Sequence, residues 1–220
     1  AFSGTPVTIH CNVGSAAHEY AKAHNIPFLA RGVTPEKLLY TMDQQGVTIN
    51  GPEDPIFVVL TAIHIPDRIH GEVVNRIGEK AFYEYDRLTE ITLPSGITSI
   101  GNSAFKGCSN LTKVINTSGI RNIGDYAFDT CLNLVSFDMP SDVQNIGVGA
   151  FQGCLGLNTP LTIPAGITEI KDKAFERTGF TSVTIPSTVK SIGNGAFDGC
   201  KASSMTIAEG VNTIGDDAFR

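Results

Sequence analysis

The sequence contains no tryptophan, only 17% of its residues are charged, and it has no long uninterrupted apolar run. A transmembrane helix needs roughly 20 consecutive apolar residues, so we expect no membrane insertion. The formal net charge is −6, and Lys and Arg form no basic stripe of the kind that binding to phosphates requires. The composition therefore predicts a protein that does not bind nucleic acid.

Signatures of catalysis and of metal binding are also missing. The sequence has no CxxC zinc spacing, nucleophile elbow or phosphate loop, and no carboxylate pair with a base beside it. His18 and His24 are six residues apart, whereas two zinc ligands on one helix face need a spacing of four. We interpret both histidines as side chains on a solvated helix face. The sequence predicts no enzyme activity, no metal and no cofactor.

The sequence instead contains a repeat. The pair Ala-Phe returns every 22 to 24 residues, and its phenylalanines are Phe82, Phe105, Phe128, Phe151, Phe175, Phe197 and Phe219. Self-similarity at this period is typical of a solenoid, in which each coil buries its apolar side against its neighbours. We therefore look for the function on a surface that several stacked coils share.

Each repeat begins with a short predicted strand. In the repeat that starts at Leu88, Ile91 and Leu93 alternate with Thr92, so Ile91 and Leu93 are expected to point inward and Thr92 outward. Pro94 then ends the hydrogen-bonded ladder, because proline has no backbone N–H to donate. The same pattern in later repeats predicts a row of parallel strands.

The rest of the repeat predicts a second extended segment and a turn. Ile97 and Ile100 form a further inward-facing pair, and Gly101 precedes polar residues that open a turn. We expect this turn to be helical or 3₁₀ and to carry the phenylalanine, here Phe105, into the core. A large ring beside a small alanine allows adjacent coils to approach closely.

These elements resemble the BspA-like class of bacterial leucine-rich repeats. The matching motifs are LxxIxLP at residues 88–94, IxxIG at 97–101 and AFxGC at 104–108, and their repeats cover roughly residues 60 to 220. The resemblance implies a leucine-rich-repeat solenoid, mainly β within the α/β class, with right-handed coils, parallel strands on one face and short turns on the other. Members of this class are typically secreted or surface-attached and are associated with adhesion, which implies an extracellular or cell-surface location.

The N-terminal part resembles the closing cap of such an array. Ser15 can serve as an N-cap, and the alanine-rich segment to Ala23 favours a short helix. A short N-terminal helical cap could cover the apolar side of a last coil. We predict a closing cap of a preceding array at residues 1–30, a connector at 31–39, and a second array at 40–220 that opens with a hairpin and is truncated at its C-terminal end. We expect exposed end coils to favour edge-to-edge self-association.

Four of the five cysteines share one position, shortly after the repeated phenylalanine. They are Cys108, Cys131, Cys154 and Cys200. Disulfides are one explanation in a secreted chain. A column of buried free thiols is the other, and we favour it because free cysteine is among the most buried residue types.

The candidate ligand-binding residues are those at the outward position of each predicted strand: His64, Thr92, Ile115, Asp138, Thr162, Thr184 and Thr206. A solenoid offers such an extended face to a protein or glycan ligand. Threonine also suits the outside of a strand simply through its β-branch. Two coils depart from the pattern, one at Asn116 and Thr117 and one at Pro160, and we expect a local bend at each.

The sequence therefore predicts a non-catalytic module of adhesion type that binds a protein or glycan through its strand face. Two alternatives stay open at this point. The chain could be a structural spacer that presents other domains, or a substrate-recognition appendage of an enzyme that lies outside it.

Overall fold

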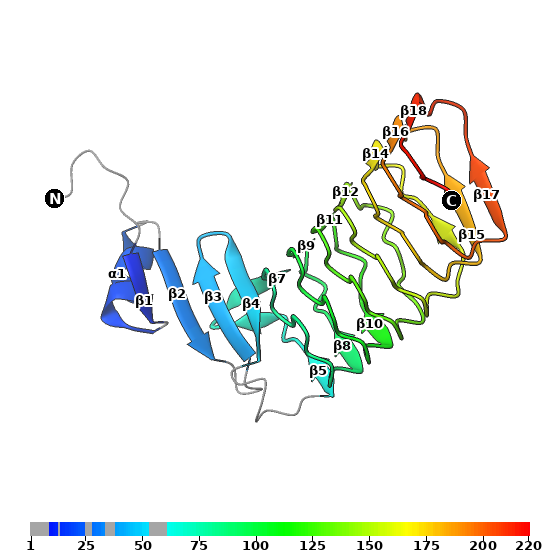
Figure 1. Ribbon diagram of the computed structural model, residues 1–220. Helices are drawn as coiled ribbons and strands as arrows, with labels where there is room; N and C mark the ends of the chain where they lie inside the picture. Colours follow the sequence, from blue (N-terminus) through cyan, green and yellow to red (C-terminus); the bar gives the residue numbers. More distant parts are fainter. Residues whose placement is uncertain (1–8, 13, 25–27, 34–37, 53–60) are drawn as a thin grey trace.

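A mainly β solenoid makes up most of the molecule, and one short helix lies near its N-terminal side (Figure 1). The computed structural model describes residues 9–12, 14–24, 28–33, 38–52 and 61–220. Residues 1–8 and 34–37, on which parts of the predicted cap and connector fall, lie outside the described residues. The division of the chain at residues 30 and 39 stays a prediction.

The N-terminal unit combines one helix with four strands. Their bounds are Ile9–Asn12 for β1, Ala16–Ala23 for α1, Phe28–Val33 for β2, Leu38–Asp43 for β3 and Gly46–Pro52 for β4. β1 and β2 are parallel, whereas β3 pairs with both β2 and β4 in the antiparallel sense. A tight turn joins β3 to β4, and in it the Gln45 N–H donates to Oδ1 of Asp43 at 2.8 Å.

Helix α1 begins where it was predicted, but one of the two histidines expected in solvent is buried. Ser15 is its N-cap and accepts a hydrogen bond from the His18 N–H at 3.2 Å. The buried side chains of the helix are His18 and Ala21. The interpretation of His18 as a solvated side chain was wrong, since it is buried on a helix that packs against β1 and β2. The N–H of Gly14, which has φ +76°, donates to Nδ1 of His18 at 3.0 Å. His24 is exposed, as expected.

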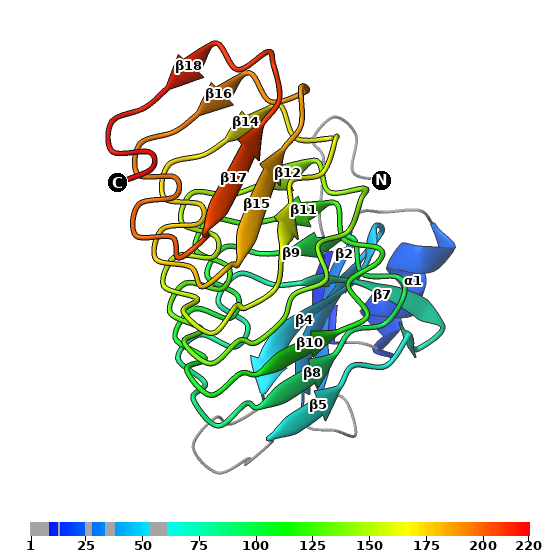
Figure 2. The same ribbon diagram turned by 90° about the vertical axis from the view of Figure 1, so that its right-hand side faces the viewer.

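The coils carry two rows of parallel strands. The front strands are β5 Ala62–His64, β8 Glu90–Thr92, β10 Lys113–Ile115, β13 Leu161–Thr162, β15 Ser182–Ile185 and β17 Ser204–Ile207. The rear strands are β7 Glu72–Ile77, β9 Ser99–Ile100, β11 Asn122–Ile123, β12 Asn145–Ile146, β14 Glu169–Ile170, β16 Ser191–Ile192 and β18 Thr213–Ile214. Figure 2 shows both rows with the C-terminal coils nearest the viewer.

The rear strands continue the sheet of the N-terminal unit. One nine-stranded sheet runs β1-β2-β3-β4-β7-β9-β11-β12, and β6, Arg68–Ile69, pairs with β7. β6 and β7 form an antiparallel hairpin whose turn residues His70 and Gly71 both have positive φ, as type I′ hairpin turns require. Lys22 of α1 and Glu72 of β7 form an ion pair at 2.8 Å, which ties the helix to this hairpin.

Both strand rows are interrupted at the same level of the array. The front row is divided into the sheets β5-β8-β10 and β13-β15-β17, and the rear row resumes after β12 in the separate sheet β14-β16-β18. The predicted irregularity at Pro160 lies here, immediately before β13. The front segment of the coil that contains β12 forms no named strand, and an isolated bridge pairs its Ser136 with Lys113 of β10.

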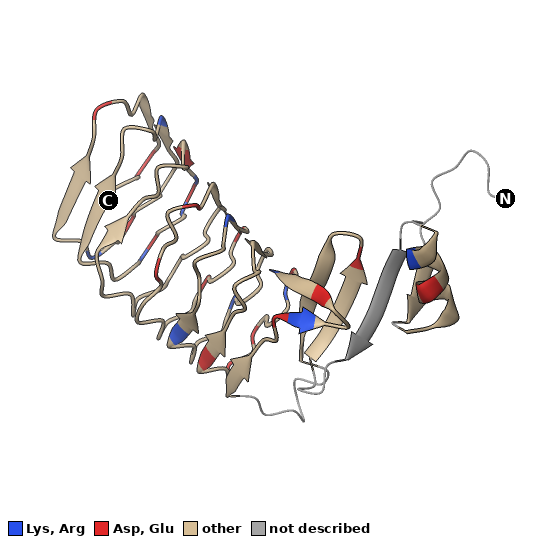
Figure 3. Cartoon of the chain, turned by 180° about the vertical axis from the view of Figure 1, so that it is seen from behind, with Lys and Arg blue, Asp and Glu red and all other residues tan. Residues whose placement is uncertain are grey.

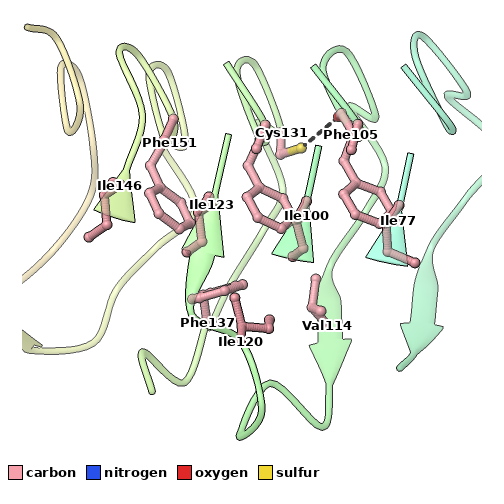
Figure 4. Close-up of a cluster of buried hydrophobic side chains, with 14 of the residues drawn as sticks. Ile77, Ile100, Phe105, Val114, Ile120, Ile123, Cys131, Phe137, Ile146 and Phe151 are labelled. Atoms are coloured by element: carbon pink, nitrogen blue, oxygen red, sulfur yellow. Dashed lines mark hydrogen bonds between the residues drawn. The ribbon is translucent and has the colours of Figure 1, made fainter. Parts of the chain in front are cut away.

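The core is a continuous column of phenylalanine rings, as the repeat predicted. The rings of Phe82, Phe105, Phe128, Phe151, Phe175, Phe197 and Phe219 stack in sequence, with centroids 5.2 to 5.8 Å apart and planes within 12° of each other. Phe137 packs edge-on against Phe128 and Phe151. Figure 4 shows this column beside the isoleucines of the rear strands.

The turn side of the coils is a series of short hydrogen-bonded turns. In one coil the Ala104 N–H donates to the Gly101 carbonyl and the Cys108 N–H to the Phe105 carbonyl. Between these bonds, the Phe105 N–H donates to the carbonyl of Ala127 in the next coil at 2.8 Å. The turns do not continue into a regular helix. Residues such as Ser103 have positive φ angles, and every second backbone N–H donates to a carbonyl of the neighbouring coil.

The cysteine column consists of free thiols. The Sγ atoms of Cys108, Cys131 and Cys154 each donate to the carbonyl of a phenylalanine in the preceding coil, at 3.0 to 3.1 Å. Burial raises the pKa of Cys108 to about 12 and also raises the pKa values of Cys131 and Cys154. These side chains act as small buried hydrogen-bond donors that link adjacent coils.

Candidate functional site

The predicted ligand-binding residues form two ladders on the outer side of the front strands. In the first sheet His64 lies opposite Thr92, and Thr92 lies opposite Ile115. In the second sheet Thr162 lies opposite Thr184, and Thr184 lies opposite Thr206. His64 and the threonines of the second sheet are exposed, whereas Thr92 and Ile115 are half-buried. We call these ladders, together with Asp138, the strand face.

Asp138 occupies the interruption between the two ladders. It is exposed, but the segment around it lies outside the named strands. The structure therefore does not bring the predicted residues into one unbroken column. Apart from Ile115, the residues of both ladders are polar.

The interruption starts at Asn116, which has φ +65°. This left-handed conformation turns the side chain of Asn116 out to solvent, although the repeat pattern assigns an inward side chain to that position. Thr117 is buried in its place, only 5% exposed. The backbone is thus irregular where the repeat pattern breaks, while Ile115 keeps its pairing with Thr92.

A hollow of about 490 Å³ opens beside this bulge. Its walls come from two adjacent coils and include Lys113, Ile115, Asn116, Ser136, Asp138 and Pro140. We call it the sheet-break hollow. Lys113 and Asp138 are both exposed, and within the described part of the chain no ion pair joins either side chain to an opposite charge.

The chemistry of the hollow is mixed. Lys113 supplies a cation and Asp138 an anion, while Asn116 and Ser136 supply neutral donors and acceptors. Ile115 and Pro140 add apolar surface. Figure 3 shows the same mixture over the whole array, since acidic and basic residues alternate along the coils without a stripe of one sign.

Metal and membrane sites find no support in the part of the chain that is described. Over those residues, no group of three or more His, Cys, Asp or Glu side chains is placed to hold a metal ion. No helix there is both long and apolar enough to span a bilayer.

The sequence pointed to the interruption without revealing the hollow. The departure of Asn116 and Thr117 from the repeat was visible in the sequence. Asn116, Ser136 and Pro140 were not predicted to share a site, because their proximity depends on how one coil stacks on the next.

Comparison with protein families gives a match over residues 59–178 and 158–220. The family is described as BspA type leucine rich repeat region, and the match comprises 6 copies. Among curated proteins, none matches the sequence.

Solved structures of bacterial leucine-rich repeat proteins share the fold. The T. pallidum leucine rich repeat protein has a TM-score of 0.70 and 29% sequence identity, over 85% of this chain and 83% of that chain. A leucine rich cell surface protein from Faecalibacterium prausnitzii A2-165 has a TM-score of 0.62 and 25% identity, over 80% of this chain and 54% of that chain. This chain thus spans about half the length of that surface protein.

A third relative supports the fold alone. The pneumococcal vaccine antigen PcpA has a TM-score of 0.60 and 23% identity, over 83% of this chain and 51% of that chain. All three similarities cover the solenoid architecture derived above from the repeat.

Proposed function

The chain belongs to the BspA-type leucine-rich repeat family, and on that premise we propose that it is a non-catalytic binding module that recognises a protein or glycan through its strand face. The observation that carries the proposal is the strand face itself. Its ladders present His64 and a set of threonines to solvent over many stacked coils, with a hollow between them. An extended surface of short polar side chains is how a solenoid recognises a large partner.

The proposed setting is the outside of a bacterial cell, where the module mediates adhesion. Similarity to the cell surface protein of F. prausnitzii supports this location. The chain's acidic balance, with a formal net charge of −6, fits a protein or glycan better than a polyanion, because it would repel phosphate groups.

A binding screen with two charge-matched variants tests the proposal. The chain is passed over immobilised extracellular-matrix proteins and a glycan array. The face variant carries Thr92→Arg, Asp138→Arg and Thr184→Arg. The control variant carries Asn122→Arg, Glu169→Arg and Thr213→Arg on exposed positions of the rear strands, so both variants change the net charge equally.

We expect the parent and the control to bind the same ligand and the face variant to lose it, with equal thermal stability of all three. Loss of binding in the control variant alone would show that the ligand contacts the rear strands and not the strand face. If the parent binds nothing on either panel, the binding role is refuted and the spacer becomes the better explanation.

A further inference from the structure

We propose that the sheet-break hollow binds a neutral oligosaccharide, an inference that rests on the proposed role of the strand face in binding. Of the ladder residues, Ile115 is the one that lines the hollow. The hollow is the place where the strand face turns inward. Its volume of about 490 Å³ falls within the roughly 300–1,000 Å³ range of small-molecule sites.

The hollow is held open by the fold. In the regular coil before it, the Leu93 N–H donates to the carbonyl of Ile115. One coil later, the carbonyl of Asp138 accepts instead from the hydroxyl of Thr117. Thr117 is buried, so this side-chain bond holds the two coils together while the backbone at Asn116 turns away. The walls are therefore fixed before any ligand binds, which lowers the entropic cost of binding.

The polar groups in the walls suit hydroxyl groups. A sugar hydroxyl both donates and accepts hydrogen bonds. The ammonium of Lys113 and the amide of Asn116 can donate to it, and the carboxylate of Asp138 can accept from it. Ser136 can do either. These groups stand on both coils that form the hollow, so neighbouring hydroxyls of one sugar unit can be bound from two sides.

The charges and the apolar wall favour a neutral sugar over a charged ligand. One cation and one anion stand in the same hollow, so the attraction of an ionic ligand to one of them is offset by repulsion from the other, and a charged ligand gains no net advantage there. The carbon-bound faces of a sugar ring can lie against Ile115 and Pro140. The volume exceeds that of a single amino-acid side chain, so an oligosaccharide fills it better than one anchor residue of a protein would.

The test compares two tryptophan substitutions at equivalent positions of different coils. Ser136→Trp fills the hollow, whereas Ser182→Trp places the same ring on β15, outside it. The probes are neutral tetrasaccharides of glucose, mannose and galactose, and binding is measured by calorimetry on the 220-residue chain. We expect at least one tetrasaccharide to bind the parent and the Ser182→Trp variant, and at least about a tenfold loss of affinity in Ser136→Trp, equivalent to about 1.4 kcal/mol.

A gentler pair of variants covers the case in which Ser136→Trp disturbs folding. Asp138→Ala removes the acceptor at the hollow, and Asp142→Ala removes an exposed carboxylate from the same coil beyond it. Asp138→Ala should weaken the same tetrasaccharide about tenfold and Asp142→Ala should not. Affinity should change little between 50 and 500 mM salt, because the ligand carries no charge for ions to screen.

The outcomes separate this inference from the proposed function. If tetrasaccharides bind and both tryptophan variants lose them equally, the hollow is refuted as the site while glycan binding by the strand face stands. If no tetrasaccharide binds but a matrix protein does, and Ser136→Trp abolishes that binding, the occupant is a protein and the oligosaccharide is refuted. If nothing binds in either experiment, both proposals fail.

Discussion

The hydroxyl of Thr117 donates a hydrogen bond to the backbone carbonyl of Asp138, in the next coil along the array. In the preceding pair of coils the equivalent bond comes from a backbone N–H, that of Leu93. A side chain has thus replaced the main chain as the link between two coils. The replacement frees the backbone at Asn116 to adopt its left-handed turn, and the hollow in the strand face follows from that turn.

Removing the Thr117 hydroxyl should therefore cost stability at the interruption. We expect Thr117→Val to lower the free energy of unfolding by about 1–3 kcal/mol, because an acceptor between two coils loses its donor. Urea denaturation measures the loss. Thr184→Val is the control, since its side chain is exposed on β15 and the change should stay within about 0.5 kcal/mol. Equal effects in the two variants would contradict the role of the Thr117 bond.

The repeat predicted most of the solenoid because one period encodes one coil. A residue that recurs every 22 to 24 positions meets its own counterpart in the next coil. The stacked rings of Phe105 and Phe128 and the thiol of Cys131 bonded to the Phe105 carbonyl are direct consequences. Neither depends on any feature outside the repeat.

What the sequence could not supply are features that depend on a partner from another segment. His18 was expected in solvent and is buried, on a helix that packs against β1 and β2. The turns that carry Phe105 were expected to be helical or 3₁₀, and their bonds within the coil do span three residues, but these alternate with bonds to the next coil that the pattern did not reveal. The hollow likewise needs Asn116 and Asp138, whose proximity depends on how one coil stacks on the next.

The phenylalanine column should govern stability. Phe128 contacts the rings of Phe105, Phe151 and Phe137, so we expect Phe128→Ala to cost about 3–5 kcal/mol through the cavity it leaves. The loss should be measured by denaturant unfolding. Native-state hydrogen exchange should show faster exchange first in the coils on either side, because coupling in a solenoid is between nearest neighbours.

A matched change at the end of the column provides the comparison. Phe219 stacks on one ring among the described residues, that of Phe197, and is 38% exposed. Phe219→Ala should cost clearly less than Phe128→Ala. A cost for Phe128→Ala below that of Phe219→Ala would show that the stacked column is not the core that holds the coils together.

The repeated glycine after the rear strand should not tolerate a side chain. A Cβ atom at Gly124 would lie 2.5 Å from Oδ1 of Asn102 and 2.6 Å from its backbone N. The Asn102 side chain cannot simply move away, because its Oδ1 accepts the Asp125 N–H at 2.9 Å. We expect Gly124→Ala to destabilise by about 1–3 kcal/mol through overpacking. The exposed neighbour Asn122 supplies the control, and Asn122→Ala should leave the melting temperature nearly unchanged.

The buried thiols should be unreactive in the folded protein. Burial raises the pKa of Cys108 to about 12, so almost no thiolate is present at pH 8, and thiolate is the reactive form. A thiol reagent at that pH should label the half-buried Cys11 and Cys200 far faster than Cys108, Cys131 and Cys154. All five should react in denaturant. Rapid labelling of Cys131 in the native state would contradict its burial.

The same shifts predict that stability falls at alkaline pH. In the unfolded chain a thiol titrates near its ordinary pKa of 9.0, whereas folding raises the pKa of Cys108 to about 12. Between these values the folded protein holds a proton that the unfolded chain has released, so the free energy of unfolding decreases as pH rises. Burial also raises the pKa of Tyr40, which adds to the decline.

A variant with Cys108, Cys131 and Cys154 all changed to alanine isolates the contribution of the thiols. Its free energy of unfolding should fall less steeply than that of the parent between pH 9 and 11. Parallel profiles for the two proteins would show that the thiols contribute nothing to the pH dependence.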